Sequence, residues 1–179
     1  MIIETDINEI RRIAKLKEDE NWEFRSFLKG CDWGKIDVIV HKLYRNISSE
    51  IDCKTCGNCC KKVLPVLNQK DVERLANGLK LSVDAFKDKY IVERENNEGI
   101  TFNKKPCPFL NNNLCTQYKY RPEDCRSYPH LHKKDFSSRL INVIENTSIC
   151  PIVFNVYEAL KEKVWNNPEF DDFDDFDWD

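Results

Sequence analysis

The most informative segment of this chain is Asp52-Cys53-Lys54-Thr55-Cys56-Gly57-Asn58-Cys59-Cys60, a C-x2-C-x2-C-C pattern. Its polar sequence has neither helical nor strand periodicity, so burial of an apolar face does not account for four cysteines in eight residues. Thiolates two residues apart can converge on one metal centre because the intervening turn is tight, and Gly57 eases that turn. The pattern therefore predicts, over residues 51–65, a loop that is ordered by metal.

The other cysteines are widely spaced, and Cys31 stands apart from them in a helical region. A disulfide framework needs an oxidising compartment, whereas the N-terminus has no secretory signal and the cytosol is the default expectation. Inert buried thiols occur singly at apolar-periodic positions, which does not describe the cluster. Metal ligation fits best, with Cys31 left as a free thiol. The predicted ligands are Cys53, Cys56, Cys59, Cys60, Cys107, Cys115, Cys125 and Cys150.

The spacing favours iron over zinc without excluding zinc. Three cysteines at C-x2-C-x2-C with a distant Cys-Pro are typical of bacterial iron–sulfur proteins, and both Cys107-Pro108 and Cys150-Pro151 fit that fourth position. Cys-x2-Cys-Gly also resembles a zinc knuckle, but a four-cysteine zinc site usually has two knuckles and the second half has none. Adjacent side chains diverge, so Cys59-Cys60 predicts two ions, two corners of a cluster, or one ligand and one packed thiol.

Two arginines flank Cys125 and are candidate cofactor-binding residues. Guanidinium groups of Arg121 and Arg126 would offset the negative charge of a thiolate cluster. The alternative is a surface role in ion pairs with acids of the same segment. His130 and His132 could complete a mixed cysteine–histidine site, but the many clustered cysteines favour a loop-surface role for them.

The motifs resemble the CxxCxxCC cysteine-cluster family of zinc- or iron-chelating domains. The resemblance rests on the cysteine block and on C-P-F-L-x4-C-x2-Y-x2-R-P-x2-C-R-x-Y-P, and it covers roughly residues 52–151. Similar domains occur in flagellin lysine N-methylases, where the resemblance implies an iron–sulfur cluster that serves protein methylation. Those enzymes are longer, so methylase activity is not carried over to this chain.

Apolar spacing predicts a mainly α protein with a small, irregular α(+β) domain around the cysteine-rich loops. Positions 36 to 47 follow one helical face, Pro122 and Pro151 mark helix starts, and residues 100–102 alternate like a strand. Asn68 and Ser82 are expected to cap two further helices, and Asn77-Gly78 is expected to end the first of them. The run Asn111-Asn112-Asn113 indicates a turn. We expect a helical arm at 1–50, a metal-binding domain at 51–165, and an acidic, aromatic tail at 166–179. Stretches 51–65 and 103–130 are expected to meet around one or two metal centres. The tail is expected to be disordered, or else to dock its aromatic rings on a protein partner or on the chain's own basic surface.

Composition and motifs exclude several classes of function but do not identify the function. The chain has 179 residues and a net charge of −3, and without its tail it is too weakly basic to argue for nucleic-acid binding. No apolar run approaches membrane-spanning length, and no phosphate loop or hydrolase motif is present. Whether the protein is an enzyme stays open. The first hypothesis is an iron–sulfur protein in electron transfer or in protein or RNA modification. The alternatives are a structural zinc module that binds a partner and a metal storage or delivery protein.

Overall fold

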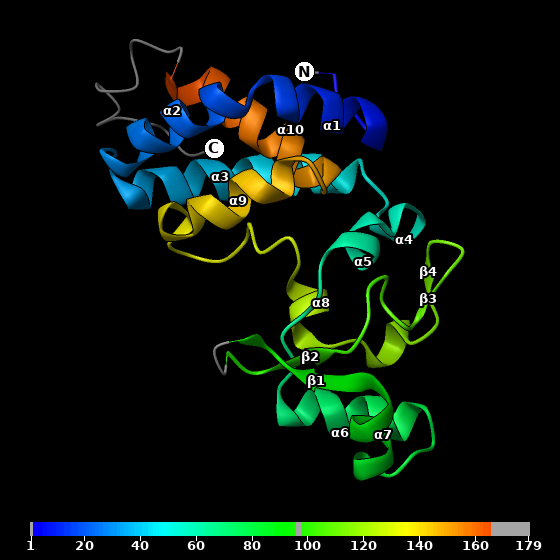
Figure 1. Cartoon of the computed structure of the whole chain (residues 1–179). Helices are drawn as coiled ribbons and strands as arrows, with labels where there is room; N and C mark the ends of the chain where they lie inside the picture. The colour runs from blue at the N-terminus through cyan, green and yellow to red at the C-terminus, as the bar shows by residue number, and fades with distance from the viewer. Residues whose placement is uncertain (1, 96–97, 166–179) are drawn as a thin grey trace. The chain divides into compact units, whose positions relative to one another are not determined.

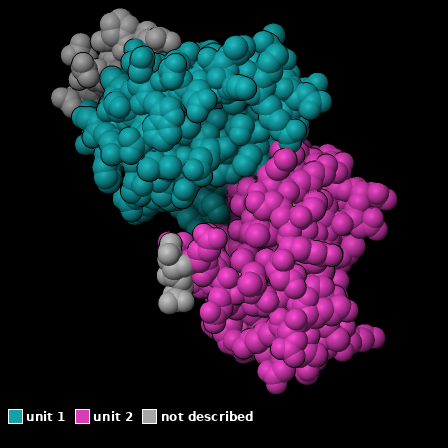
Figure 2. All heavy atoms as spheres, viewed as in Figure 1, with its two compact units in different colours: residues 1–51, 129–179 teal, residues 52–128 magenta. Residues whose placement is uncertain are grey.

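The computed structural model describes residues 2–95 and 98–165, and over these residues it is mainly helical with two small two-stranded sheets (Figure 1). This confirms the predicted fold class. Two compact units are distinguished by their internal contacts (Figure 2). Unit 1 combines the described residues up to Ile51 with those from Pro129 onward, and unit 2 is Asp52–Tyr128. The division at residues 50 and 165 stays a prediction, and the predicted tail lies outside the described residues.

Unit 1 is a set of helices packed around α10 (Pro151–Leu160). Every residue of α10 except Glu158 is buried, as expected for a helix that is apolar on all sides. It packs against α1 (Ile7–Leu16), α3 (Trp33–Ser49) and α9 (Leu140–Thr147). The remaining elements are α2 (Glu18–Lys29), the 3-10 helix η3 (Phe136–Arg139) and the π-helical turn η4 (Lys161–Trp165). The face that α3 buries is the one that the apolar spacing predicts.

The core of unit 1 encloses the charged side chain of Lys161. Its Nζ donates hydrogen bonds to Glu20 Oε1 at 2.7 Å, Asn21 Oδ1 at 2.6 Å and Glu158 Oε1 at 2.8 Å. A buried ammonium is tolerated only when it is paired in this way. Beside it, the Tyr157 hydroxyl donates to Asn21 O at 3.2 Å, and burial raises the pKa of Tyr157 well above its usual range.

Unit 2 contains the cysteine block, both sheets and several short helices. In chain order these are α4 (Cys53–Cys56), α5 (Asn58–Lys62), α6 (Gln69–Gly78), α7 (Val83–Tyr90), β1 (Ile91–Glu93), β2 (Ile100–Phe102), β3 (Leu110–Asn111), β4 (Leu114–Cys115), η2 (Tyr118–Tyr120) and α8 (Glu123–Ser127). Strands β1 and β2 pair antiparallel with Ile91 opposite Phe102, and β3 and β4 pair with Leu110 opposite Cys115.

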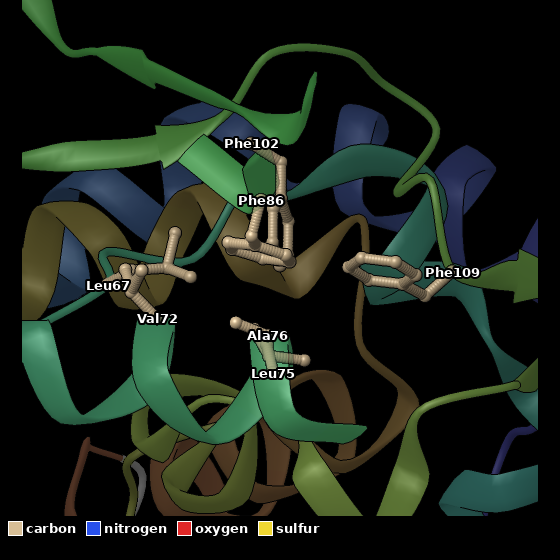
Figure 3. Packing of buried hydrophobic residues seen from close by; sticks show 7 residues of the cluster. All are labelled: Leu67, Val72, Leu75, Ala76, Phe86, Phe102 and Phe109. Carbon is tan, nitrogen blue, oxygen red and sulfur yellow. The ribbon is translucent and has the colours of Figure 1, made fainter. Parts of the chain in front are cut away.

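A small hydrophobic core holds unit 2 together. Figure 3 shows its side chains converging from α6, α7, β2 and the neighbouring loops: Leu67, Val72, Leu75, Ala76, Phe86, Phe102 and Phe109. Phe109 lies just before β3 and forms edge-to-face contact with Phe102, their ring centroids 5.3 Å apart. Two cysteines, Cys107 and Cys115, pack against this core from its edge. The core therefore positions one side of the cysteine-bearing loops.

The prediction of a loop over 51–65 is wrong for most of the cysteine block, which forms the two short helices α4 and α5. The Asp52 side chain caps α4 by accepting from the Lys54 N–H at 2.9 Å. Gly57, at φ 59°, ends α4 and begins α5. Each helix is too short to show apolar periodicity, which is why the sequence pattern does not reveal it.

Other local predictions are confirmed. Asn68 caps α6 in a reciprocal capping box, and Ser82 caps α7 by accepting from the Ala85 N–H at 3.2 Å. Asn112 and Asn113 take positive φ angles of 46° and 66° in the turn of the β3–β4 hairpin. Among the described residues, no helix is long and apolar enough to cross a membrane.

Helix α6 ends at Gly78, as predicted, although the positive φ of 57° that reverses the chain falls on Lys80. A Cβ atom at Gly78 would lie 2.5 Å from Cδ2 of the Tyr120 ring. The glycine therefore serves the close approach of η2 to α6 rather than the chain reversal.

Candidate metal centre

The cysteine block is held in shape by its own backbone before any metal is considered. The Asp52 carbonyl accepts from the Thr55 N–H at 3.2 Å, and the Cys59 carbonyl accepts from the Val63 N–H at 2.7 Å. Between these turns, Gly57 adopts the left-handed conformation that other residues reach only with strain. The two cysteine pairs are thus presented from adjacent one-turn helices.

The block is docked on the β3–β4 hairpin. A Cβ atom built on Gly57 would lie 2.6 Å from the carbonyl oxygen of Asn113 and 2.9 Å from its Cα. Helix α4 contacts β4, and the Cys107 N–H donates to the Cys60 carbonyl at 2.8 Å. The predicted meeting of stretches 51–65 and 103–130 is therefore confirmed, whereas a metal between them stays a prediction.

Four thiols from separate segments share one electrostatic neighbourhood centred on Cys60. Charge on Cys60 raises the pKa of Cys107, Cys115 and Cys125 alike. Burial is the larger cause in each case: it raises the pKa of Cys107 to about 11 and that of Cys125 well above its usual range. A hydrogen bond from Cys59 lowers the pKa of Cys60 to about 7 despite its own burial. The thiols of α5, of the hairpin segment and of α8 are thus close enough for charge on Cys60 to act on the others.

The first cysteine pair of the block lies toward solvent. Cys53 is exposed and Cys56 is half-buried. Partial desolvation of the thiol, together with charge on Cys56, raises the pKa of Cys53. All nine cysteines lie within the described residues, and none of them forms a disulfide.

The donor set fits a thiolate metal centre, although the thiols are not yet gathered tightly. Within residues 2–95 and 98–165, no three Cys, His, Asp or Glu side chains stand close enough to hold a metal ion as they are. Sulfur donors are the ligands that both zinc and iron–sulfur clusters take from cysteine. A bound metal would have to draw these side chains inward and displace their protons.

Arg121 supplies positive charge to the thiols. Its guanidinium carbon lies 3.9 Å from the centroid of the Tyr118 ring, in a cation–π contact. Burial raises the pKa of Cys53 and Cys115, and the charge of Arg121 opposes that rise. The same charge adds to the lowering of the pKa of Cys60. This is the position from which a cation can offset the charge of thiolate ligands.

Arg126 acts on the backbone of the same loop. Its Nε donates to the Arg121 carbonyl at 3.1 Å, and its Nη2 donates to the Lys119 carbonyl at 2.8 Å. Arg74, from α6, also donates to the Arg121 carbonyl, at 3.0 Å. Two guanidinium groups therefore hold the main chain that carries Arg121.

Asp71, a buried carboxylate that anchors α8 on α6, was not identified from the sequence. Its Oδ1 accepts from the Glu123 N–H at 3.0 Å, its Oδ2 accepts from the Asn68 N–H at 3.1 Å, and it is paired with Arg74. With 1% exposure, its charge is compensated only through these contacts. An Asn-x-x-Asp capping pattern was the available signal, but it says nothing about the contact with α8.

Two of the nine cysteines belong to unit 1. Cys150 is buried at the N-cap of α10, and its role as a ligand stays a prediction. Cys31 follows α2, and its Sγ lies 3.5 Å from the Phe27 carbonyl. The other seven cysteines, all of them predicted ligands, belong to unit 2.

The histidines also lie in unit 1. His41 Nε2 is 3.3 Å from the Lys133 carbonyl, and the ring centroid of His132 is 6.0 Å from that of Tyr44. Partial burial and the charge of Lys133 lower the pKa of His132. His130, at φ 64°, lies in the loop before η3. The ligand set of unit 2 is therefore built from sulfur.

The mainly helical fold and the clustered thiols with Arg121 near them are features of small cysteine-cluster, metal-chelating proteins. The family profile named CxxCxxCC, described as a "putative zinc- or iron-chelating domain", matches residues 52–151. Because this match covers more than half of the chain, the protein belongs to that family. Comparison with curated proteins and with solved structures found no match.

Proposed function

We propose that the protein binds iron as an iron–sulfur cluster through its clustered cysteines. The observation that carries the proposal is the shared neighbourhood of the Cys60, Cys107, Cys115 and Cys125 thiols, with Arg121 beside them. The family supports chelation of zinc or iron, and the C-x2-C-x2-C spacing with a distant Cys-Pro favours iron. The proposed ligands are the eight predicted cysteines, of which Cys150 belongs to unit 1.

A bound cluster would supply one-electron chemistry, which suits electron transfer or a protein- or RNA-modifying system. The chain's own residues set the conditions for it. Arg121 offsets the negative charge that the thiolates acquire on losing their protons. The core side of the centre, where Cys107 and Cys115 pack, keeps water from part of the sulfur surface. Because ligation needs thiolates, binding should release protons and weaken at low pH.

Elemental analysis of the protein purified without oxygen tests the proposal directly. Iron together with acid-labile sulfide and a visible absorption band is the expected result. A colourless protein that holds zinc and no sulfide would overturn the iron–sulfur assignment. Loading the apoprotein with each metal separately, and measuring which one it retains against a chelator, excludes a preparation that merely lost iron.

A structural zinc module is the second candidate, and one observation favours it. The Cys53–Cys56 turn, closed by Gly57 in the left-handed conformation, has the form of a zinc knuckle. A structural role predicts that chelation removes metal and fold together. Metal that exchanges readily while the helical signal survives would instead point to storage or delivery.

A further inference from the structure

A cleft in unit 1, separate from the seven cysteines of unit 2, is lined by both cationic and aromatic side chains. It has a volume of about 340 Å³ and lies between α2, the start of α3, and the η3–α9 segment. Arg25, Lys29, Trp33, Ser137 and Ile141 line it. Small-molecule pockets span roughly 300–1,000 Å³, so the cleft has room for one or two large side chains rather than a nucleotide cofactor.

Two buried polar groups at this cleft lack a hydrogen-bond partner among the described residues. Ser137 is 3% exposed and its Oγ is unsatisfied, and the buried Nε of Arg25 is unsatisfied as well. Leaving such a group unpaired costs about 1–3 kcal/mol, so both groups call for an acceptor. Lys29 adds a second positive charge. An anionic oxygen is the atom that would satisfy this end of the cleft.

The other end of the cleft is apolar and open. Trp33 is 43% exposed and Ile141 is 48% exposed. An exposed tryptophan in a cleft that is also lined by an arginine is a surface on which another aromatic ring stacks favourably. The occupant is thus expected to carry a carboxylate next to an aromatic side chain.

We propose that the occupant is the chain's own C-terminal segment, residues 166–179. That segment holds seven acids, no base, and aromatic residues at positions 170, 173, 176 and 178. Each of its phenylalanines is followed by an aspartate, which matches a cleft that is cationic at one end and apolar at the other. Charge complementarity and the alternation of ring and carboxylate both favour this occupant.

The residue that precedes the segment, Trp165, packs on a helix that lines the cleft. The ring of Trp165 stacks on Phe24 and Phe27 of α2, with centroid distances of 5.2 Å and 6.4 Å. The same helix carries Arg25 and Lys29. Fourteen extended residues can span about 45–50 Å. Helix α2, with 12 residues, is only about 18 Å long, so the segment can reach the cleft. Because it is tethered, a weak contact is enough to hold it.

Fluorine NMR of the full chain labelled with 5-fluorotryptophan tests the proposal. Trp33 reports the cleft and Trp178 reports the segment, each assigned by a Trp→Phe variant. Asparagine at aspartates 171, 172, 174 and 175 should shift the Trp33 resonance and narrow that of Trp178. Arg25→Gln and Lys29→Gln should each change both resonances in the same direction. Each substitution should weaken the docking equilibrium about fivefold, which is equivalent to about 1 kcal/mol for one partly exposed ion pair.

The controls separate docking from local disturbance. Lys15→Gln, on the exposed side of α1, should leave both resonances in place. In the asparagine-substituted chain, Lys29→Gln should have no further effect on Trp33, because the occupant has already gone. The proposal is overturned if the asparagine substitutions leave the Trp33 resonance unchanged. It is also overturned if the effects of those substitutions and of Lys29→Gln on Trp33 are additive. Resonances that depend on protein concentration would assign the cleft to a second copy's segment, which also overturns it.

Discussion

Replacement of Gly57 by alanine is predicted to separate the cysteine block from the hairpin. The residue sits at φ 59°, where a non-glycine residue costs about 1–2 kcal/mol. The added Cβ would also lie 2.6 Å from the Asn113 carbonyl oxygen, a backbone atom that cannot swing aside as a side chain could. Overpacking of this kind costs a further ~1–3 kcal/mol, so unit 2 should lose about 2–5 kcal/mol of stability.

Hydrogen exchange resolves this loss because it reports on each unit separately. Amides across residues 52–128 should lose at least about thirtyfold in protection, which corresponds to about 2 kcal/mol. The tryptophans of the chain all lie outside unit 2, so the unfolding transition seen by tryptophan fluorescence should hardly move. Metal content should fall as well, since α4 no longer seats its thiols against β4.

Gly30→Ala is the matched control, because its Cβ would meet only the Phe27 carbonyl, at 3.4 Å, and its φ is −87°. That variant should stay within about 0.5 kcal/mol of the native chain. If Gly57→Ala destabilises unit 2 no more than Gly30→Ala does and also retains its metal, the docking of the block on the hairpin contributes neither to stability nor to metal binding.

Three further predictions concern the buried groups and the thiols. Asp71→Asn should destabilise unit 2 by about 1–2 kcal/mol because it removes the charge that pairs with the partly exposed Arg74 guanidinium, while exposed Glu73→Gln should be neutral by hydrogen exchange. Burial raises the pKa of Tyr157, so the folded chain keeps its phenolic proton to a higher pH than the unfolded chain does. Stability should therefore fall above about pH 10 by up to ~1.4 kcal/mol per pH unit, a slope that Tyr157→Phe should remove in pH-dependent denaturation. Cys56→Ser should lose metal and order in unit 2, whereas Cys31→Ser should keep its metal stoichiometry by elemental analysis; metal loss from Cys31→Ser would contradict the division of the thiols.

Local features of the fold could be predicted from the sequence because their causes are local. Asn68 and Ser82 begin helices through side chains that reach backbone groups three residues away. Pro151 begins α10, and the asparagines before Leu114 turn the hairpin. The short helices of the cysteine block could not be predicted because a single turn has no period. The close approach of Tyr120 to Gly78 could not be predicted because the two residues are far apart in sequence.

The residue types alone supply the chemistry of this protein, namely sulfur donors at metal-ligand spacing and a family match that rests on them. The folded chain is needed to bring Cys60 within electrostatic range of Cys107, Cys115 and Cys125, and to bring Arg121 within range of Cys60. The tertiary structure also decided that α9 and α10 complete the core of the N-terminal helices, leaving Cys150 in unit 1. The physical reason is that residue type sets which bonds a side chain can form, whereas its neighbours are set by packing between segments that are distant along the chain.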